Sequence, residues 1–409
     1  MGTDPSAPKH DGASFGTLCA LGVAQIVSWG SLYYAFSFLI TPLMEASGGD
    51  KPTVFAAFSF GLLVSGLLSA PVGALIDRIG GRGVMTAGSI AAAALLALLS
   101  QVQSVLALYA VWAGLGVVMA ATLYDPAFAV ITRLFATNYR RAITTLTLFG
   151  GFASTVFWPL TQLLIAEFGW RNALLVLALL NLVVCAPLHW RVLPRDGGRD
   201  RPRMGGSRTP GAFRAALRTP VFYLLTIAFT GNALVFSAMQ VHLMSMLQDK
   251  QLSAASAALV GAMIGPMQVT GRVLELAFAS RLSASAIGIL AMAFLPLSLW
   301  LLGVAGVQWP LLVAFAVVYG IGNGVMTIVR GAIAAELFGR EAYGAINGAM
   351  AAPVIVAKAA GPLVAALLFA WLGGYERTLV VLIVIGVIST AVFVLSTRAS
   401  RHGRPAAIQ

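Results

Sequence analysis

Five ionisable residues interrupt otherwise apolar stretches of this sequence: Asp125, Arg272, Glu275, Arg330 and Lys358. An ionised side chain is costly in an apolar environment, so such residues normally face a cavity, a partner or a ligand. Three cations stand against two carboxylates, and an unpaired buried charge would be expensive. The excess of positive charge therefore predicts binding of a small anion, for which a carboxylate is the simplest choice.

Asp125, in the sequence Leu123-Tyr124-Asp125-Pro126, is the candidate for proton coupling. A carboxyl group in a partly dry cavity can exchange a proton near neutral pH. We expect Asp125 to lie near Arg330, so that protonation weakens an ion pair and frees the guanidinium for the substrate. A permanent structural bridge between the two is the alternative.

The other candidates also have structural alternatives. Arg272 could pair with Glu275, three residues further along the same helix face, and Lys358 could bridge to Asp125. Tyr34 and Tyr124, with neighbouring Tyr33, offer aromatic surface and hydroxyl groups suited to a small planar anion, but helix packing explains them equally well.

His242 stands near the end of an apolar segment, where it could respond to pH or serve only as a hydrogen-bonding group. Cys19 and Cys185 both lie in apolar segments and give no disulfide framework. Metal-ligand spacing, a phosphate loop and a nucleophile elbow are all missing from the sequence, so we expect no enzyme activity, metal or cofactor.

Composition identifies the environment of these residues. The 409 residues are 59% hydrophobic and 10% charged, whereas soluble domains carry roughly 25% charged residues. Twelve apolar segments are each long enough to cross a hydrocarbon core of roughly 30 Å as a helix. The predicted spans are 15–44, 53–76, 84–101, 104–134, 141–166, 171–192, 219–247, 253–278, 284–306, 309–338, 343–372 and 378–397.

These segments predict an all-α polytopic membrane protein built from two six-helix bundles. The expected divisions are a tail at 1–14, a bundle at 15–192, a linker at 193–218, a bundle at 219–397 and a tail at 398–409. The Arg-rich linker and most other loop arginines fall on one side, which predicts that both termini and the linker are cytoplasmic in a bacterial inner membrane. The net charge of +12 follows from this bias, so no nucleic-acid partner is needed, although the linker could touch anionic lipids.

The most specific motif lies between the second and third segments. Gly73, Asp77, Arg78, Gly80 and Arg82 form the pattern G-x-x-x-D-R-x-G-x-R. This pattern resembles the signature loop of the major facilitator superfamily, and the twelve-segment layout extends the resemblance across the chain. The resemblance implies two pseudo-symmetric bundles, a cytoplasmic gate at this motif, and peripheral third, sixth, ninth and twelfth helices.

Within that superfamily, Arg272 and Lys358 are placed like the basic residues of the oxalate/formate antiporters, and Arg272 also like a basic residue of the monocarboxylate porters. The resemblance implies that Arg272 and Lys358 contact the substrate, and we expect Arg330, the third cation of the apolar segments, to join them. The chain departs from the porters at Phe38, where they have Lys, and at Gln268, where they have Asp. Proton coupling would therefore need another carboxyl, for which Asp125 is the candidate.

The predicted function is secondary active transport of a small organic anion, such as a monocarboxylate, by proton symport or anion exchange. The chief alternative is a proton-coupled exporter of drugs, which would need a broad apolar cavity and an unpaired carboxylate. A membrane receptor that binds without transporting is a further alternative. One chain holds both halves of the pathway, so a monomer would suffice.

Overall fold

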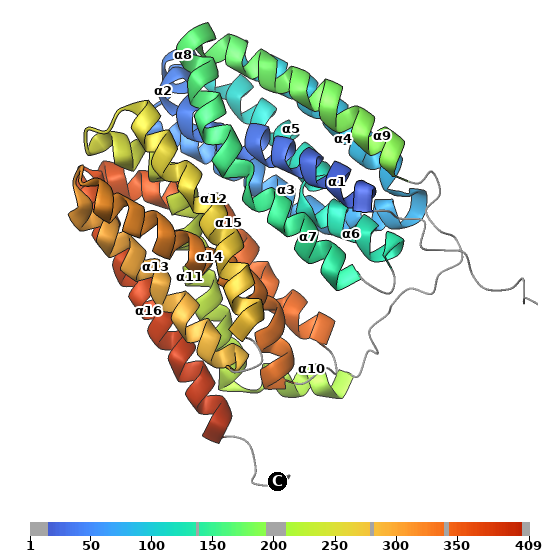
Figure 1. Ribbon diagram of the computed structural model, residues 1–409, viewed down its shortest axis with the longest axis vertical. Helices are drawn as coiled ribbons and strands as arrows, with labels where there is room; N and C mark the ends of the chain where they lie inside the picture. The colour runs from blue at the N-terminus through green and yellow to red at the C-terminus, as the bar shows by residue number, and fades with distance from the viewer. Residues whose placement is uncertain (1–14, 136–138, 194–209, 279–281, 339–342, 403–409) are drawn as a thin grey trace, which may run out of the picture.

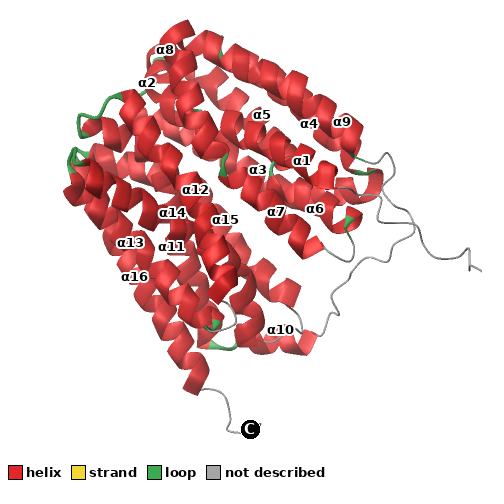
Figure 2. Cartoon of the chain, in the orientation of Figure 1, coloured by secondary structure: helices red, strands yellow, loops and turns green. Residues whose placement is uncertain are grey.

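The computed structural model is helical throughout the part of the chain that it describes, which comprises residues 15–135, 139–193, 210–278, 282–338 and 343–402. Figures 1 and 2 show the helices packed side by side, with loops only at their ends. The elements are α1 (Phe15–Trp29), η1 (Gly30–Tyr34), α2 (Phe36–Ser47), α3 (Lys51–Ile79), α4 (Gly81–Leu99), α5 (Val105–Thr122), α6 (Tyr124–Leu134), α7 (Tyr139–Gly151), α8 (Ala153–Leu180), η2 (Asn181–Cys185), α9 (Ala186–Val192), α10 (Pro210–Leu217), α11 (Pro220–Asp249), α12 (Ala254–Phe278), α13 (Ala284–Ala305), α14 (Trp309–Phe338), α15 (Tyr343–Leu372) and α16 (Tyr375–His402).

Eleven helical segments of the described chain are long and apolar enough to cross a membrane. One of them, Arg141–Val192, has 52 residues and would measure about 78 Å as a straight helix. It is broken at Gly169, where a positive φ of 76° turns the chain back. This segment therefore supplies two crossings, and the prediction of an all-α protein with twelve spans is confirmed.

The helices form two halves, which Figure 1 shows side by side in blue to green and in yellow to red. The N-terminal half runs from α1 to α9 and the C-terminal half from α11 to α16. Between them, α3 packs against α15 and α8 against α12. Helix α10 occupies the last part of the stretch expected as a linker. Helix α16 continues to His402, so the first part of the tail expected at 398–409 is helical. Residues 1–14, 194–209 and 403–409 lie outside the described residues.

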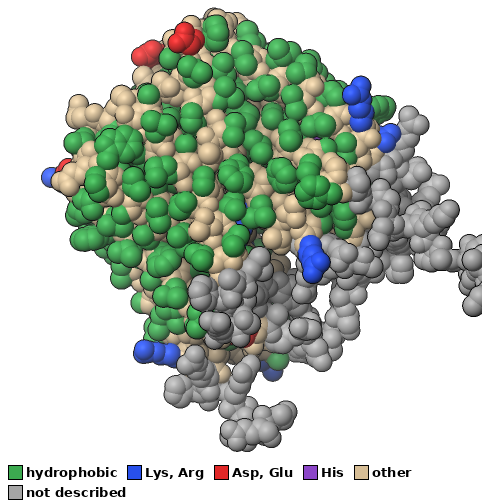
Figure 3. Space-filling model, in the orientation of Figure 1, with side chains coloured by type: hydrophobic (Ala, Val, Ile, Leu, Met, Phe, Trp, Pro, Cys, Tyr) green, Lys and Arg blue, Asp and Glu red, His purple; other side chains and the backbone are tan. Residues whose placement is uncertain are grey.

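The surface of the bundles suits a lipid environment. Large apolar side chains are well exposed around the molecule, including Leu106 and Trp371, which are each 82% exposed. Figure 3 shows a face dominated by hydrophobic side chains, with few charged ones. Such continuous apolar exposure would be unfavourable in water, so the chain is a multi-pass membrane protein.

The fourth crossing is interrupted where functional residues were predicted. Helix α5 ends at Thr122 and α6 begins at Tyr124. Pro126 has no N–H, so it cannot donate to the carbonyl of Thr122 four residues earlier. The buried Gln25 of α1 satisfies this carbonyl, because its Nε2 donates to the Thr122 oxygen at 2.8 Å. The break is therefore held by another helix of the same half.

The first crossing contains a π-helical turn, η1, in which the N–H of Ala35 donates to the carbonyl of Gly30, five residues earlier, at 2.9 Å. A second π-helical turn, η2, lies beside it, and Asn181 of η2 donates to the Ser31 hydroxyl at 2.8 Å. Single π-turns are frequent at functional sites. Tyr33 and Tyr34 both lie in η1, so this turn positions two of the predicted aromatic groups.

Replacing Gln25 with Leu should destabilise the N-terminal half by about 1–3 kcal/mol, the typical penalty of an unsatisfied buried polar group. The change leaves the Thr122 carbonyl without a donor. Thermal unfolding in detergent measures the loss. Pro126→Ala restores a backbone N–H, so Gln25→Leu should cost less in that background; equal costs in both backgrounds would contradict this account of the break.

Candidate functional site

A central cavity of about 320 Å³ lies between the halves. Its walls come from the first, fourth, fifth, seventh, eighth, tenth and eleventh crossings. The third, sixth, ninth and twelfth crossings contribute none of its described lining, as expected for peripheral helices. The lining residues are Trp29, Tyr34, Tyr124, Phe128, Thr147, Gly150, Phe229, Asn232, Ala233, Phe236, Gln240, Gln268, Arg272, Asn323, Met326, Thr327, Arg330, Asn347, Ala351 and Lys358.

Arg272 of α12 reaches across to the N-terminal half. Its side chain is only 4% exposed, and its Nη1 donates to the carbonyl oxygen of Thr147 in α7. Its Nε is buried without a hydrogen-bond partner, so one donor of the guanidinium is unsatisfied in this conformation. Arg272 forms no ion pair with Glu275 among the described contacts, so the alternative of an intrahelical pair is not formed in this conformation.

Arg330 of α14 and Lys358 of α15 complete the group of cations. Both line the cavity, where the Lys358 side chain is exposed although it lies between the bundles. Lys358 lies within electrostatic range of Arg330, which repels it, and of Asp125, which attracts it. None of the described residues that line the cavity is acidic, so three positive charges face this space.

Asp125 lies in the first turn of α6 and is exposed. One oxygen of its carboxylate accepts a hydrogen bond from the Ser69 hydroxyl of α3 at 2.6 Å. The structure does not bring Asp125 and Arg330 into an ion pair, so the pairing expected from the repeat is not formed in this conformation. Lys358 is the cavity cation whose charge Asp125 influences.

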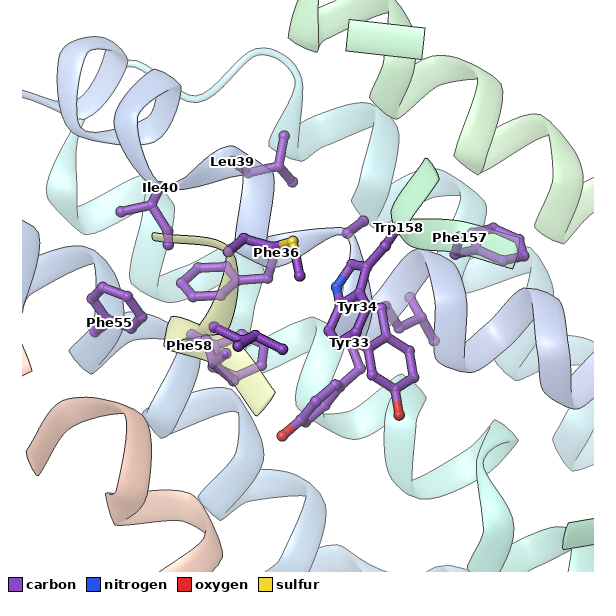
Figure 4. Close-up of a cluster of buried hydrophobic side chains, with 14 of the residues drawn as sticks. Tyr33, Tyr34, Phe36, Leu39, Ile40, Phe55, Phe58, Phe157 and Trp158 are labelled. Carbon is purple, nitrogen blue, oxygen red and sulfur yellow. The ribbon is translucent and has the colours of Figure 1, made fainter. Parts of the chain in front are cut away.

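Tyr34 and Tyr124 both line the cavity, as predicted. Figure 4 shows Tyr33 and Tyr34 extending in a similar direction from the first crossing. The Tyr34 hydroxyl accepts a hydrogen bond from Nε2 of Gln240 in α11 at 3.3 Å, which links the two halves. The Tyr124 hydroxyl lies against Gly150, where any Cβ atom would overlap it. Glycine at position 150 is therefore required for this placement of the tyrosine.

The halves are held together at the end of α3 that begins with Lys51, which we call the closed end. The Lys51 ammonium lies 3.9 Å from the ring centroid of Phe369 and 4.5 Å from that of Tyr375. Phe55 stacks on His242 with centroids 3.9 Å apart. These contacts cover the end of the cavity that is distant from α10.

His242 is completely buried, and both ring nitrogens are bonded. Nε2 lies 2.8 Å from the Pro362 carbonyl oxygen, which can only accept, so Nε2 carries the proton and donates. Nδ1 then accepts from the Tyr375 hydroxyl at 2.9 Å. These contacts correspond to the hydrogen-bonding alternative for this residue, although the histidine joins three helices and is not a helix-end group.

The fold and this central cavity agree with the comparison to known families. A family model described as Major Facilitator Superfamily matches residues 21–306. The chain belongs to the Major Facilitator Superfamily. Among solved structures of the same fold are a bacterial homolog of the human lysosomal transporter Spinster in an inward-facing, occupied conformation (TM-score 0.75, 13% identity, all of both chains covered) and the nucleoside transporter NupG (TM-score 0.72, 13% identity, 94% of this chain and 98% of that chain).

Two curated relatives of this superfamily member carry more specific names. Monocarboxylate transporter 13 of Bos taurus is 30% identical over 280 residues, which cover 66% of this chain and 63% of the relative. Monocarboxylate transporter 4 of Mus musculus is 36% identical over 145 residues, which cover 33% of this chain and 29% of the relative. The chain thus matches less than two thirds of the length of each. The predicted resemblance to the monocarboxylate porter branch is confirmed.

The superfamily signature lies away from the closed end, where α3 meets α4. Gly73, Asp77 and Arg78 belong to α3, and the turn itself is made at Gly80, whose φ is +87°. Arg82 opens α4, donates from Nε to the Leu193 carbonyl and lies 5.6 Å from the Trp190 ring centroid. The described contacts of Arg82 therefore stay within the N-terminal half.

Sequence reasoning missed most of the uncharged polar groups in the cavity. Asn232, Gln240, Asn323 and Asn347 all line it, and Gln268 was noted only as a departure from the porters. A carboxamide in an apolar helix is the available signal, because it needs a hydrogen-bond partner away from lipid. That signal indicates burial against protein but does not distinguish a cavity from a helix contact.

The contact between α3 and α15 can be tested by crosslinking. A Cβ atom at Gly66 would lie 3.8 Å from the Ile355 Cβ, and disulfides have Cβ atoms about 3.5–4.5 Å apart. The variant Gly66→Cys, Ile355→Cys, with Cys19 and Cys185 replaced by Ser, should therefore form a disulfide on mild oxidation. Protease cleavage at a site inserted in the linker should leave two fragments joined until reductant is added.

Gly73→Cys with Ile355→Cys is the matched control, because nothing lies within 4 Å of a Cβ at Gly73. That pair should remain uncrosslinked. Equal crosslinking of both pairs, or of neither, would contradict the packing of α3 on α15.

Proposed function

We propose that this Major Facilitator Superfamily transporter moves a small organic anion, most simply a monocarboxylate, by alternating access. The observation that carries the proposal is the group of three cations, Arg272, Arg330 and Lys358, around a cavity whose described lining has no acidic residue. An anion that enters the cavity compensates charge that the protein leaves unbalanced. The names of the two curated relatives support a carboxylate.

Arg330 and Lys358 are the primary carboxylate ligands in this proposal, because no described ion pair engages either of them. Arg272 has a different role. Its Nη1 already donates to Thr147 across the halves, whereas its buried Nε has no partner. A substrate carboxylate that accepts from Nε would therefore bind beside the contact that joins α12 to α7.

Coupling to protons would use Asp125, the carboxylate whose charge acts on Lys358. Proton uptake by Asp125 would remove the negative charge that attracts Lys358 and leave the ammonium to the substrate. The Ser69 hydroxyl can keep a hydrogen bond to Asp125 in either state, since it can both donate and accept. Anion exchange is the coupling mode if Asp125 stays ionised throughout the cycle.

We further propose a bacterial inner-membrane location with both termini and the linker in the cytoplasm. The distribution of arginines among the short loops supports this orientation. With that orientation the closed end faces outward and this conformation is inward-facing. An exporter of cationic drugs is disfavoured, because a cation would meet three like charges in the cavity.

Replacing Arg330 or Lys358 with Ala should weaken carboxylate binding about tenfold to a hundredfold, since a hydrogen bond to a charged group contributes roughly 1.5–3 kcal/mol. Ligand-dependent thermal stabilisation of the purified protein measures binding, because a ligand of the native state raises its apparent stability. Arg377→Ala is the matched control, since this exposed arginine contacts the Leu372 carbonyl outside the cavity. Unchanged affinity in both cavity variants would refute the anion site.

Replacing Asp125 with Asn should abolish uptake driven by a pH gradient while exchange of internal for external substrate survives. The carboxamide has nearly the same shape but cannot take part in proton transfer at this position. Proteoliposomes with and without a pH gradient separate the two activities. Ser69→Ala keeps the carboxylate and should retain coupling, whereas gradient-driven uptake by a folded Asp125→Asn protein would exclude the proposed proton route.

A further inference from the structure

The two halves contribute different chemistry to the cavity. All three cations that line it belong to the C-terminal half, and so do all of its carboxamides. The N-terminal half contributes neither cations nor carboxamides to the described lining but several aromatic side chains, among them Trp29, Tyr124 and Phe128, whereas the rings of the C-terminal half are Phe229 and Phe236. A ligand that touches both walls therefore meets all the charges and carboxamides on one side and an uncharged, ring-rich surface on the other.

The three rings of the N-terminal half form a continuous surface, which we call the aromatic wall. Trp29 and Tyr124 have centroids 5.1 Å apart, and Tyr124 stacks on Phe128 at 5.2 Å with an interplanar angle of 9°. Each ring is only partly buried, although this region lies between the bundles and away from lipid. The wall thus presents apolar surface to a cavity that also holds three cations.

The position of the wall is fixed by its surroundings. Gly150 leaves room for the Tyr124 hydroxyl, as described above. The break at Leu123 makes Tyr124 the first residue of α6 and so determines the direction in which its side chain extends. Rings that are held in place at low entropic cost make effective binding surfaces, because little freedom is lost when a ligand docks. Aromatic faces also attract other rings beyond simple burial of area.

We propose that the transported substrate is a carboxylate that carries an aromatic ring. Its carboxylate binds Arg330 and Lys358 on the C-terminal half, and its ring packs against Trp29, Tyr124 and Phe128 of the aromatic wall. This inference rests on the proposed anion transport and narrows its substrate class. The cavity volume of about 320 Å³ falls at the lower end of the roughly 300–1,000 Å³ common for small-molecule sites, so a ring can be accommodated.

Carboxylic acids of two or three carbons should bind in this cavity more weakly than acids that carry a ring. A ligand of that size can reach the cations, but it leaves the aromatic wall in contact with water. Burial of apolar surface favours binding, so an acid whose ring covers the wall should bind more tightly than an acid that is too small to reach it. The site therefore distinguishes carboxylates by the group that is attached to them and favours an aromatic ring.

A series of matched ligands tests the inference on the full-length, detergent-purified protein. Phenylacetate supplies charge and ring, cyclohexylacetate supplies charge and a non-planar body, acetate supplies charge alone, and benzyl alcohol supplies a ring without charge. Thermal stabilisation should be half-saturated at a phenylacetate concentration at least tenfold lower than for acetate and about threefold to tenfold lower than for cyclohexylacetate. Benzyl alcohol should not stabilise.

Variants then assign the preference to the wall. Phe128→Leu removes one ring face and should bring the ratio of phenylacetate to acetate affinity several-fold closer to one. Phe128→Tyr keeps a ring and should retain the ratio, which covers the case in which the Leu variant folds poorly. Phe60→Leu, at an exposed ring outside the cavity lining, should also leave the ratio unchanged.

The outcomes separate this inference from the proposed function. If acetate stabilises as well as phenylacetate, and Arg330→Ala abolishes both effects, the aromatic preference is overturned while anion transport stands. If no carboxylate stabilises the protein, both are overturned. If phenylacetate is preferred but the ratio survives in Phe128→Leu, the assignment to the aromatic wall is overturned.

Discussion

The low dielectric of the bilayer interior governs this structure, because any polar group placed there must be satisfied by the protein itself. The break in the fourth crossing illustrates the constraint. Pro126 removes one backbone donor to the Thr122 carbonyl, and Gln25, 97 residues before Thr122, supplies another at 2.8 Å. The same constraint confines the intramembrane cations to the one place where water or an anion can reach them.

Close approach of the halves depends on glycine in the eighth crossing. A side chain at Gly265 would overlap Thr155 and approach the Gly151 carbonyl, and one at Gly261 would overlap Trp158. These glycines let α12 lie directly on α8. Arg272, about two turns beyond Gly265, can then reach the carbonyl of Thr147 in α7. The packing of α12 on α8 thus determines which guanidinium N–H groups of Arg272 bond to the protein.

Much of this could be predicted because burial of charge is costly and leaves few options. The spans follow from hydropathy, and Arg272, Arg330 and Lys358 were placed in a cavity because lipid could not accommodate them. The partner of Asp125 could not be predicted from the repeat, which suggested Arg330, whereas the carboxylate accepts from Ser69. An offset known only to a few residues does not fix a helix face, since one residue rotates the side chain by about 100°.

Uncharged polar residues were harder to interpret for a related reason. Asn232 and Asn323 line the cavity, whereas Asn181 bonds Ser31 inside the N-terminal half. Each is a carboxamide in an apolar helix, and their environments depend on contacts between distant segments. The hydrogen bond from Gln25 to the Thr122 carbonyl could not be predicted from the sequence either, because the prediction requires knowing that α1 lies beside the broken fourth crossing.

The bonds of His242 have a consequence for how the protein changes shape. Its partners, Pro362 and Tyr375, belong to the same half as the histidine, so the C-terminal half alone forms the surface that meets Phe55. Lys51 and Phe55 touch that surface through rings and charge without hydrogen bonds. The halves can therefore separate there without leaving those histidine bonds broken. The conformational equilibrium can accordingly be tuned at Lys51 or Phe55 without weakening the fold of the C-terminal half.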